Sequence, residues 1–329
     1  MPRKTGEKDM KMNSSLFPGT LVIVLLFCSS AEMARSQVKP VGESAEVAEL
    51  DALKHEAEGG NPEAAYKLGF RYLRGRGVSP DFNEAARWFK LAAAAGSADG
   101  EFGLGFLYEQ GKGVPRDYRQ AIAYYIAAAK QGHANAENNL ASMYQRGQGV
   151  RRDPASAMRW YRASAEQGNL TAECNLASLY FRGIGVAQNY SQAATWFRAA
   201  AQQGYAPAQE NLAWMFYTGT GVDVDFSEAA KWVRAAAEQG FARAELDLAY
   251  LYEQGKGVPL DYVSAYVWYK SAADHGEKRA GARLRSVSTV MTDDQIRRAT
   301  AAAEQMHLPV STEDDPSSDV IGKAFSERR

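Results

Sequence analysis

The stretch Gly183-Ile184-Gly185-Val186 is one of six Gly-x-Gly-Val turns in the chain, and their spacing decides the fold. The copies start at residues 75, 111, 147, 183, 219 and 255, so each start lies 36 residues after the previous one. Equal spacing without insertions indicates a repeat array, in which each repeat buries its apolar face against its neighbours. We therefore expect one elongated body of repeats.

The charge of the chain is nearly balanced. The 329 residues include 38 Lys and Arg against 39 Asp and Glu, which gives a formal net charge of −1. This balance favours neither nucleic acid nor an anionic membrane as a partner, and we expect neither. Hydrophobic residues make up 46% of the chain, which is enough for a core along the whole array.

Each repeat begins with a helical pattern. Counted from Asn61 as position one, the repeats are 61–96, 97–132, 133–168, 169–204, 205–240 and 241–276. Position eight is always Leu and position twelve is always aromatic, and a spacing of four places both on one helical face. The predicted core pairs are Leu68 and Tyr72, Leu104 and Tyr108, Leu140 and Tyr144, Leu176 and Tyr180, Leu212 and Phe216, and Leu248 and Tyr252.

The Gly-x-Gly-Val turn is predicted to end this first helix, because glycine adopts the left-handed conformation of a helix C-terminus. The turn glycines are Gly75, Gly77, Gly111, Gly113, Gly147, Gly149, Gly183, Gly185, Gly219, Gly221, Gly255 and Gly257. Three residues after each Val stands Asp or Asn, which is typical of the N-cap of a second helix. Glu84, Gln120, Gln192 and Glu228 are expected to complete capping boxes.

The second helix carries an aromatic residue at position 28. This position holds five of the six tryptophans of the chain, and that regularity favours a structural role in the core over stacking on a cofactor. We predict that the six residues are buried: Trp88, Tyr124, Trp160, Trp196, Trp232 and Trp268.

The combined pattern over residues 61–276 resembles the Sel-one-like repeat, a longer relative of the tetratricopeptide repeat. The resemblance rests on the Leu and aromatic positions, the Gly-x-Gly-Val turn, the Asp cap and the Ala-x2-Trp pattern, all in phase six times. It implies an all-α fold, a right-handed superhelical α-solenoid of antiparallel helix pairs. It also implies an adaptor or protein-binding role.

The segments outside the repeats have separate assignments. We predict a signal peptide at 1–31, a linker at 32–46, a partial repeat helix at 47–60, capping helices at 277–307 and a disordered tail at 308–329. The capping helices are expected at 279–291 and 293–306, the second opened by a capping box at Thr292.

The N-terminus has the features of an export signal. Basic residues precede an apolar run at 21–27, and Ser29 and Ala31 suit signal peptidase. The run is too short to span a bilayer, so we expect a periplasmic or secreted protein with no stable span after cleavage. An uncleaved anchor and a lipoprotein attached through Cys28 are alternatives. If translation starts after the run, the chain is a cytoplasmic adaptor.

Nothing in the sequence indicates a catalytic, metal or cofactor site. The histidines lack metal-ligand spacing, and His133 and His275 stand at repeat boundaries, where we expect them to be solvated. Cys174 has no His partner nearby in its repeat and is interpreted as incidental. One branch of the resembling family is described as penicillin-binding or β-lactamase-like, but its repeats are rich in cysteine. A hydrolase acting on β-lactams or peptidoglycan is therefore the weaker alternative to a non-catalytic scaffold.

The variable positions of the first helix are the candidates for binding. In the tetratricopeptide arrangement, positions six, ten, thirteen and fourteen line a concave groove, and aromatic and Arg residues are frequent hot spots. The candidates are Tyr66, Phe70, Phe102, Phe106, Arg146, Phe181, Arg182, Trp214, Tyr217 and Tyr250. Packing between neighbouring repeats is the alternative for the aromatic ones. We expect a monomer that binds a protein or peptide, with envelope signalling and host contact as open roles.

Overall fold

The computed structural model describes residues 43–306, with side chains from residue 49 onward. The predicted signal peptide at 1–31, the tail at 308–329 and most of the linker at 32–46 lie outside the described residues. Within the described part every regular element is a helix. The helices are α1 (Glu43–Glu58), α2 (Pro62–Arg74), α3 (Phe82–Ala94), α4 (Ala98–Gln110), α5 (Tyr118–Lys130), α6 (Ala134–Arg146), α7 (Pro154–Glu166), α8 (Leu170–Arg182), α9 (Tyr190–Gln202), α10 (Ala206–Thr218), α11 (Phe226–Ala237), α12 (Ala242–Gln254), α13 (Tyr262–Asp274), α14 (Ala280–Ser288) and α15 (Asp293–Gln305).

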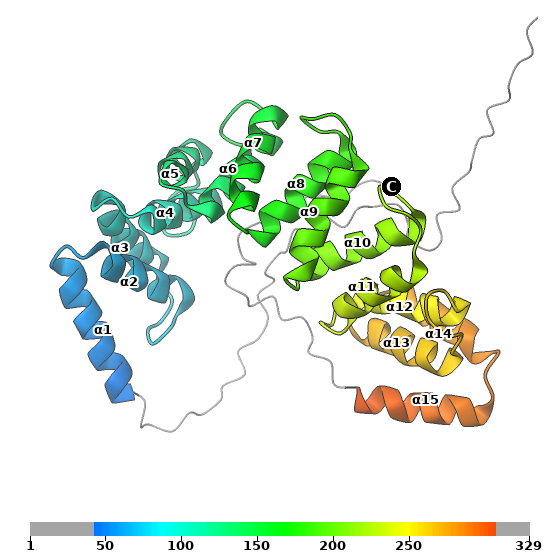
Figure 1. Cartoon of the computed structure of the whole chain (residues 1–329). Helices are drawn as coiled ribbons and strands as arrows, with labels where there is room; N and C mark the ends of the chain where they lie inside the picture. Colours follow the sequence, from blue (N-terminus) through cyan, green and yellow to red (C-terminus); the bar gives the residue numbers. More distant parts are fainter. Residues whose placement is uncertain (1–42, 307–329) are drawn as a thin grey trace, which may run out of the picture. The chain divides into compact units, whose positions relative to one another are not determined.

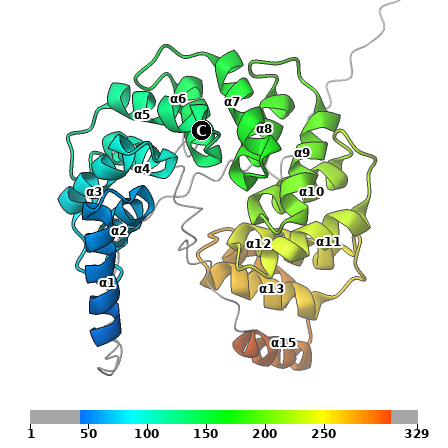
Figure 2. The same cartoon turned by 60° about the vertical axis from the view of Figure 1, so that its left-hand side comes forward.

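Each repeat is one pair of helices, from α2 with α3 to α12 with α13. The two helices of a pair lie side by side and antiparallel (Figures 1 and 2). The predicted all-α repeat architecture is therefore confirmed. The described residues fall into two compact units, an N-terminal unit up to Ala200 and a C-terminal unit from Ala201.

The two glycines of each turn have different structural tasks. The first caps the first helix in the left-handed conformation, as Gly111 does with a φ of 68°. In four of the turns, at Gly113, Gly149, Gly185 and Gly257, the second lies against the preceding repeat, so that a Cβ atom on Gly113 would sit 2.0 Å from the backbone oxygen of Phe82. The second glycine is thus required both for its φ of 67° and for the close approach of two repeats.

The N-caps of the second helices follow the prediction, but the capping boxes do not. The Asp81 carboxylate accepts hydrogen bonds from the backbone N–H groups of Asn83 and Glu84 at 2.8 and 3.1 Å. The Glu228 side chain does not reach back to its cap, because it accepts hydrogen bonds from Lys231 and Trp232. Likewise, Glu84 accepts a hydrogen bond from Arg87 at 3.4 Å.

The apolar core divides into a fully buried row and a half-buried one. The six Leu residues at position eight are 0–1% exposed. At position twelve, Tyr180 and Phe216 are buried, whereas the other four tyrosines are half-buried.

The burial of the tryptophan position differs from the prediction. Trp88 is 2% exposed, but the residues at position 28 in the other five repeats are half-buried. The buried residue is the next one along, at position 29: Phe89, Tyr125, Tyr161, Phe197, Val233 and Tyr269. The reason is helical geometry, since position 29 lies four residues after a buried Ala and position 28 only three. A step of four residues returns closer to the same face than a step of three.

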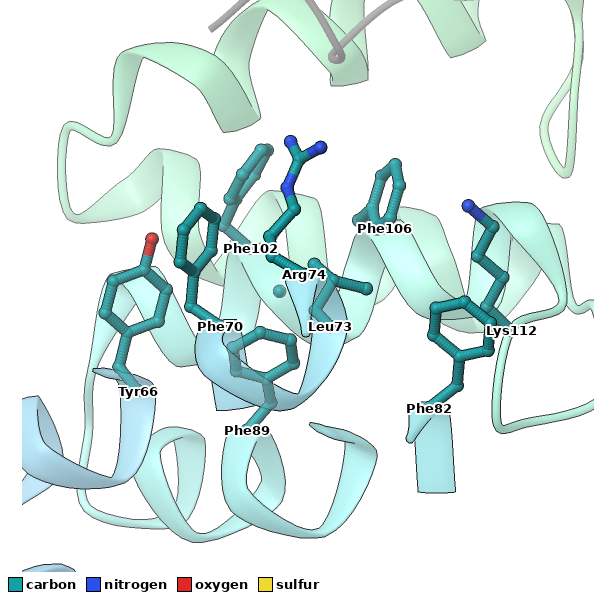
Figure 3. A pocket seen from close by; sticks show the side chains of 10 residues that line it. Tyr66, Phe70, Leu73, Arg74, Phe82, Phe89, Phe102, Phe106 and Lys112 are labelled. Atoms are coloured by element: carbon teal, nitrogen blue, oxygen red, sulfur yellow. The ribbon is translucent and has the colours of Figure 1, made fainter. Parts of the chain in front are cut away.

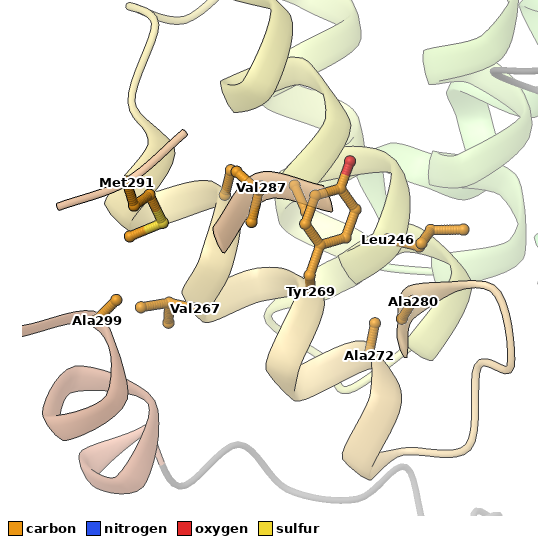
Figure 4. Packing of buried hydrophobic residues seen from close by; sticks show 10 residues of the cluster. Leu246, Val267, Tyr269, Ala272, Ala280, Val287, Met291 and Ala299 are labelled. Atoms are coloured by element: carbon orange, nitrogen blue, oxygen red, sulfur yellow. The ribbon is translucent and has the colours of Figure 1, made fainter. Parts of the chain in front are cut away.

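Two further helices pack on the last repeat. Val287, Met291 and Ala299 join the cluster that contains Val267 and Tyr269 (Figure 4). Helix α14 ends at Ser288, earlier than the predicted residue 291, and α15 begins with the predicted capping box, in which the Thr292 hydroxyl accepts from the backbone N–H of Gln295 at 3.2 Å. Among residues 43–306, no helix combines the length and the apolar character that a membrane crossing requires.

Candidate partner-binding site

A pocket of about 130 Å³ opens between α2 and α4 in the N-terminal unit (Figure 3). Its wall is mostly aromatic. The lining residues are Tyr66, Phe70, Leu73 and Arg74 from α2, Phe82 and Phe89 from α3, Phe102, Gly103 and Phe106 from α4, and Lys112 from the turn after α4.

The pocket exists because position seven of the second repeat is glycine. A Cβ atom on Gly103 would lie 2.8 Å from the ring of the buried Phe89, so no larger residue fits without a shift. In the third repeat the same position is Asn139, which fills the space and donates its amide hydrogen to the Tyr125 hydroxyl oxygen at 3.1 Å. The local sequence, and not the repeat pattern, therefore places the pocket.

The aromatic walls are braced by further contacts. The ring of Tyr66 lies 5.8 Å from that of Phe89, and burial raises the pKa of its hydroxyl. Phe102 stacks on His133 with ring centroids 4.6 Å apart. Such contacts add to the stabilisation that burial of the rings provides. The pocket is thus held in shape by contacts between its own lining rings and by His133, which lies outside it.

Two cationic side chains lie over rings of the pocket wall. The Arg74 guanidinium is 5.6 Å from the centroid of Phe70. The Lys112 ammonium is 5.4 Å from the centroid of Phe82 and 5.6 Å from that of Phe106. These distances fall within the range of cation–π attraction.

Four of the ten predicted groove residues line this pocket: Tyr66, Phe70, Phe102 and Phe106. The sequence did not mark Phe82, Phe89 and Lys112 as pocket residues, because they belong to the second helix and the turn. The glycine at position seven, where other repeats carry Lys, Asn or Asp, is the signal that could have located it.

Three other candidates of the N-terminal unit lie outside the pocket. Phe181 packs edge-on against Tyr190, with ring centroids 5.0 Å apart. Burial lowers the pKa of the Arg182 guanidinium. Arg146 is half-buried, and its charge lowers the pKa of the Glu109 carboxyl against the larger effect of burial.

The last three candidates belong to the C-terminal unit. Tyr217 packs edge-on against Phe226 at 5.2 Å, and its hydroxyl accepts a hydrogen bond from Lys256 at 2.7 Å. Trp214 is half-buried. Tyr250 lines a separate cavity of about 330 Å³, together with Leu246, Asp247, Tyr269, Arg279, Ala282 and Arg283.

The residue type at position thirteen depends on whether position 29 of the same repeat offers a hydroxyl group to hydrogen-bond. Tyr125 donates its hydroxyl hydrogen to Glu109 at 2.7 Å, and Tyr161 donates to Gln145 at 3.0 Å. Tyr269 donates to Glu253 in the same way. In the other three repeats position 29 has no hydroxyl, and position thirteen is Leu, Phe or Tyr. Polar residues at position thirteen therefore accept the hydroxyl hydrogen bonds of the buried tyrosines at position 29.

Position six also differs from the predicted groove. From the third repeat on it is buried, and in the fifth repeat it holds Glu210, which is 3% exposed. The carboxylate is 3.0 Å from the Arg243 Nε atom. Burial raises the pKa of Glu210 to about 7, more than Arg243 lowers it. Burial, together with the negative charge of Glu210, also raises the pKa of Asp247.

The two boundary histidines are not solvated as expected. His133 caps α6 by accepting the Ala136 N–H at 3.1 Å, and its other ring nitrogen is 3.2 Å from Asp99. His275 lies 2.9 Å from the buried Glu245. Their side chains are 13% and 14% exposed, because each ring packs at the contact between successive repeats. Cys174 is buried. Residues 43–306 hold no group of three side chains placed to bind a metal ion.

Comparisons with known proteins agree on the repeat. The family model of the Sel1 repeat matches residues 62–97, 98–133, 134–169, 170–205, 206–241 and 242–277. No curated protein matches the chain.

Two crystal structures resemble it. The first is a protective antigen present in uropathogenic Escherichia coli strains displaying an SLR fold, with 34% identity and a TM-score of 0.70. That match covers 77% of this chain and 56% of the antigen, so this chain spans little more than half of that protein. The second is a Sel1 repeat protein from Oxalobacter formigenes, with 27% identity, a TM-score of 0.59, and coverage of 71% of this chain and 97% of the other. With six matched repeats over about two thirds of its length, this chain belongs to the Sel1 repeat family.

Proposed function

We propose that this protein is a non-catalytic scaffold, exported to the cell envelope, that binds a protein or peptide through the pocket between α2 and α4. Sel1 repeat proteins commonly act as protein-interaction scaffolds. The observation that carries the proposal is the pocket itself, in which the half-exposed rings of Phe70 and Phe106 stand over the buried ring of Phe89.

The pocket is suited to binding because it is formed before a partner arrives. Its floor is Phe89, which is 1% exposed, and its width depends on Gly103, which has no side chain to reorder. A preformed site spends little binding free energy on ordering the receptor. Aromatic and Arg side chains are also frequent among the residues that contribute most to binding. Envelope signalling and host contact would both use such a surface.

Export is the second part of the proposal. It rests on the basic and apolar segments before Ala31 and is supported by the likeness to a protective antigen. Mass spectrometry of the protein from the envelope fraction should find a mature N-terminus close to residue 32. A chain recovered intact from the cytosol would contradict export but would leave the binding proposal standing.

The binding proposal is tested with a pocket variant and a surface control. Tagged wild-type protein, the Phe70→Ala/Phe106→Ala variant and the Leu91→Ala variant are each used to capture proteins from envelope extracts. Leu91 is 43% exposed on α3 and lies outside the pocket, so it controls for the loss of an exposed apolar group. We expect the wild type and the Leu91→Ala control to capture the same proteins. The captured amount of these proteins should be at least tenfold lower with the pocket variant. Equal capture by all three folded proteins would refute the proposal.

A further inference from the structure

The pocket between α2 and α4 has a charged rim of one sign. Arg74 and Arg76 lie over the Phe70 ring, at 5.6 and 5.8 Å from its centroid. Lys112 lies over Phe106 and Phe82 at one end of the apolar cavity, and Arg74 rises between Phe70 and Phe106 (Figure 3). No carboxylate lines the pocket.

Two of these cations lack an anionic partner. Among the described side chains, neither Arg76 nor Lys112 has a carboxylate within ion-pair distance. In the same unit, Lys67 pairs with Glu63, Arg71 with Glu49 and Arg87 with Glu84. Arg76 and Lys112 are exposed, so their charges are available to a ligand.

The cavity is the size of one side chain. A volume of about 130 Å³ is below the roughly 300–1,000 Å³ of pockets that hold whole cofactors or drug-sized ligands. A cavity of about 150 Å³ with an apolar lining holds a single benzene ring. The pocket therefore accommodates one large apolar side chain, and the rest of its ligand must lie outside it, along the charged rim.

We propose that this pocket binds an acidic peptide segment, which inserts one large apolar side chain between Phe70 and Phe106 and places carboxylates on either side of it against Arg76 and Lys112. The inference rests on the proposed protein-binding function and specifies the chemistry of the partner. Charge complementarity argues for it, since the exposed Arg76 and Lys112 lie over rings of the pocket wall and no carboxylate lines the pocket. Such complementarity governs specificity and association rate more than total affinity.

Single-stranded nucleic acid is the rival ligand, because bases also stack on aromatic side chains beside cations. The charge of the protein disfavours it. A nucleic-acid groove carries a row of cations along the backbone, whereas this chain has a net charge of −1 and three cations at one pocket. The peptide proposal is therefore the one that the observations favour.

The test uses the full chain and three fluorescein-labelled nine-residue peptides. The first has a central leucine with two glutamates on each side. The second has lysines in place of the glutamates, and the third has serine in place of the leucine. Fluorescence anisotropy at low salt should show the first peptide binding at least tenfold more tightly than the other two. This preference should shrink as salt is added, because the rim charges are exposed to solvent.

Variants locate the binding. Lys112→Glu should lower the affinity for the acidic peptide at least tenfold and raise the affinity for the lysine peptide. Lys90→Glu makes the same charge change on the exposed face of α3, outside the pocket, and should alter neither affinity by more than twofold. Both sites are exposed, so both variants should fold, and circular dichroism checks this.

The outcomes separate the two proposals. Equal binding of the acidic and lysine peptides, an unchanged affinity in Lys112→Glu, or tighter binding of labelled oligothymidine would each overturn the inference. If no peptide binds while Phe70→Ala/Phe106→Ala still abolishes capture of envelope proteins, the protein-binding function stands and the acidic chemistry is wrong. If neither experiment depends on the pocket, both proposals fail.

Discussion

Replacing Glu210 with Gln should make the C-terminal unit more stable at alkaline pH. The carboxyl group is 3% exposed on α10, and burial raises its pKa from 4.5 to about 7. The charges that face it are those of Arg243, Arg279 and Glu277, together with Asp247, whose own pKa is raised by burial. The two arginines lower the pKa of Glu210, and Glu277 raises it, but burial has the largest effect.

The sign of the effect follows from the raised pKa in the folded state. A carboxyl group with a higher pKa in the folded protein contributes stability that is fully present below pH 4.5 and is lost as the pH rises through about 7. The difference between 4.5 and about 7 corresponds to about 3 kcal/mol, because one pKa unit equals ~1.4 kcal/mol. Glutamine resembles the protonated carboxyl, so Glu210→Gln should gain up to about this amount at pH 8 and almost nothing at pH 4.5.

Urea unfolding at pH 4.5, 6 and 8, followed by far-UV circular dichroism, measures the effect. The wild type should lose stability across this range, and Glu210→Gln should lose distinctly less. Glu238→Gln, at an exposed position of the same unit, is the control and should follow the wild type. A variant that parallels the wild type at every pH, or that is less stable at pH 8, would show that the buried carboxyl does not carry this penalty.

Two further predictions concern packing within the repeats. Phe197→Ala should cost about 3–5 kcal/mol of unfolding free energy, whereas Trp196→Ala should cost clearly less, because Phe197 is 0% exposed and Trp196 is half-buried. If denaturant melts show that Trp196→Ala loses as much unfolding free energy as Phe197→Ala, position 28 belongs to the core after all. Gly113→Ala should destabilise by more than about 3 kcal/mol, since its Cβ atom would meet a backbone oxygen at 2.0 Å. Gly96→Ala, with a φ of +82° and open space around it, should cost only about 1 kcal/mol. Similar melting temperatures for the two glycine variants would contradict the close contact at Gly113.

The repetitive features of the fold could be predicted because each occurs six times in the sequence. The turn glycines, the Asp caps and the Leu row follow directly from the 36-residue period. The burial of the aromatic residues could not be placed to within one residue, because positions 28 and 29 are both aromatic in five of the six repeats. Only the packing of the helices against one another shows that Phe197 faces the core and that Trp196 lies at its edge.

The candidate site depends on what breaks the repetition. Variation at positions six and thirteen suggests recognition, yet Gln145 varies because it accepts a hydrogen bond from Tyr161, and Glu210 is buried beside Arg243. Both effects link positions that are separate in the repeat pattern. The pocket itself arises from Gly103, which removes one side chain and uncovers the Phe89 ring. Such consequences follow from three-dimensional contacts and not from periodicity.

The central claim is that the pocket between α2 and α4 meets a protein partner. The most direct measurement is photo-crosslinking in the cells that produce the protein, with benzoylphenylalanine in place of Phe106 and, as control, in place of the exposed Leu91. We expect a discrete protein adduct from position 106 that position 91 does not give and that Lys112→Glu reduces. The same adducts from both positions, or none from position 106 while the protein stays folded, would contradict it.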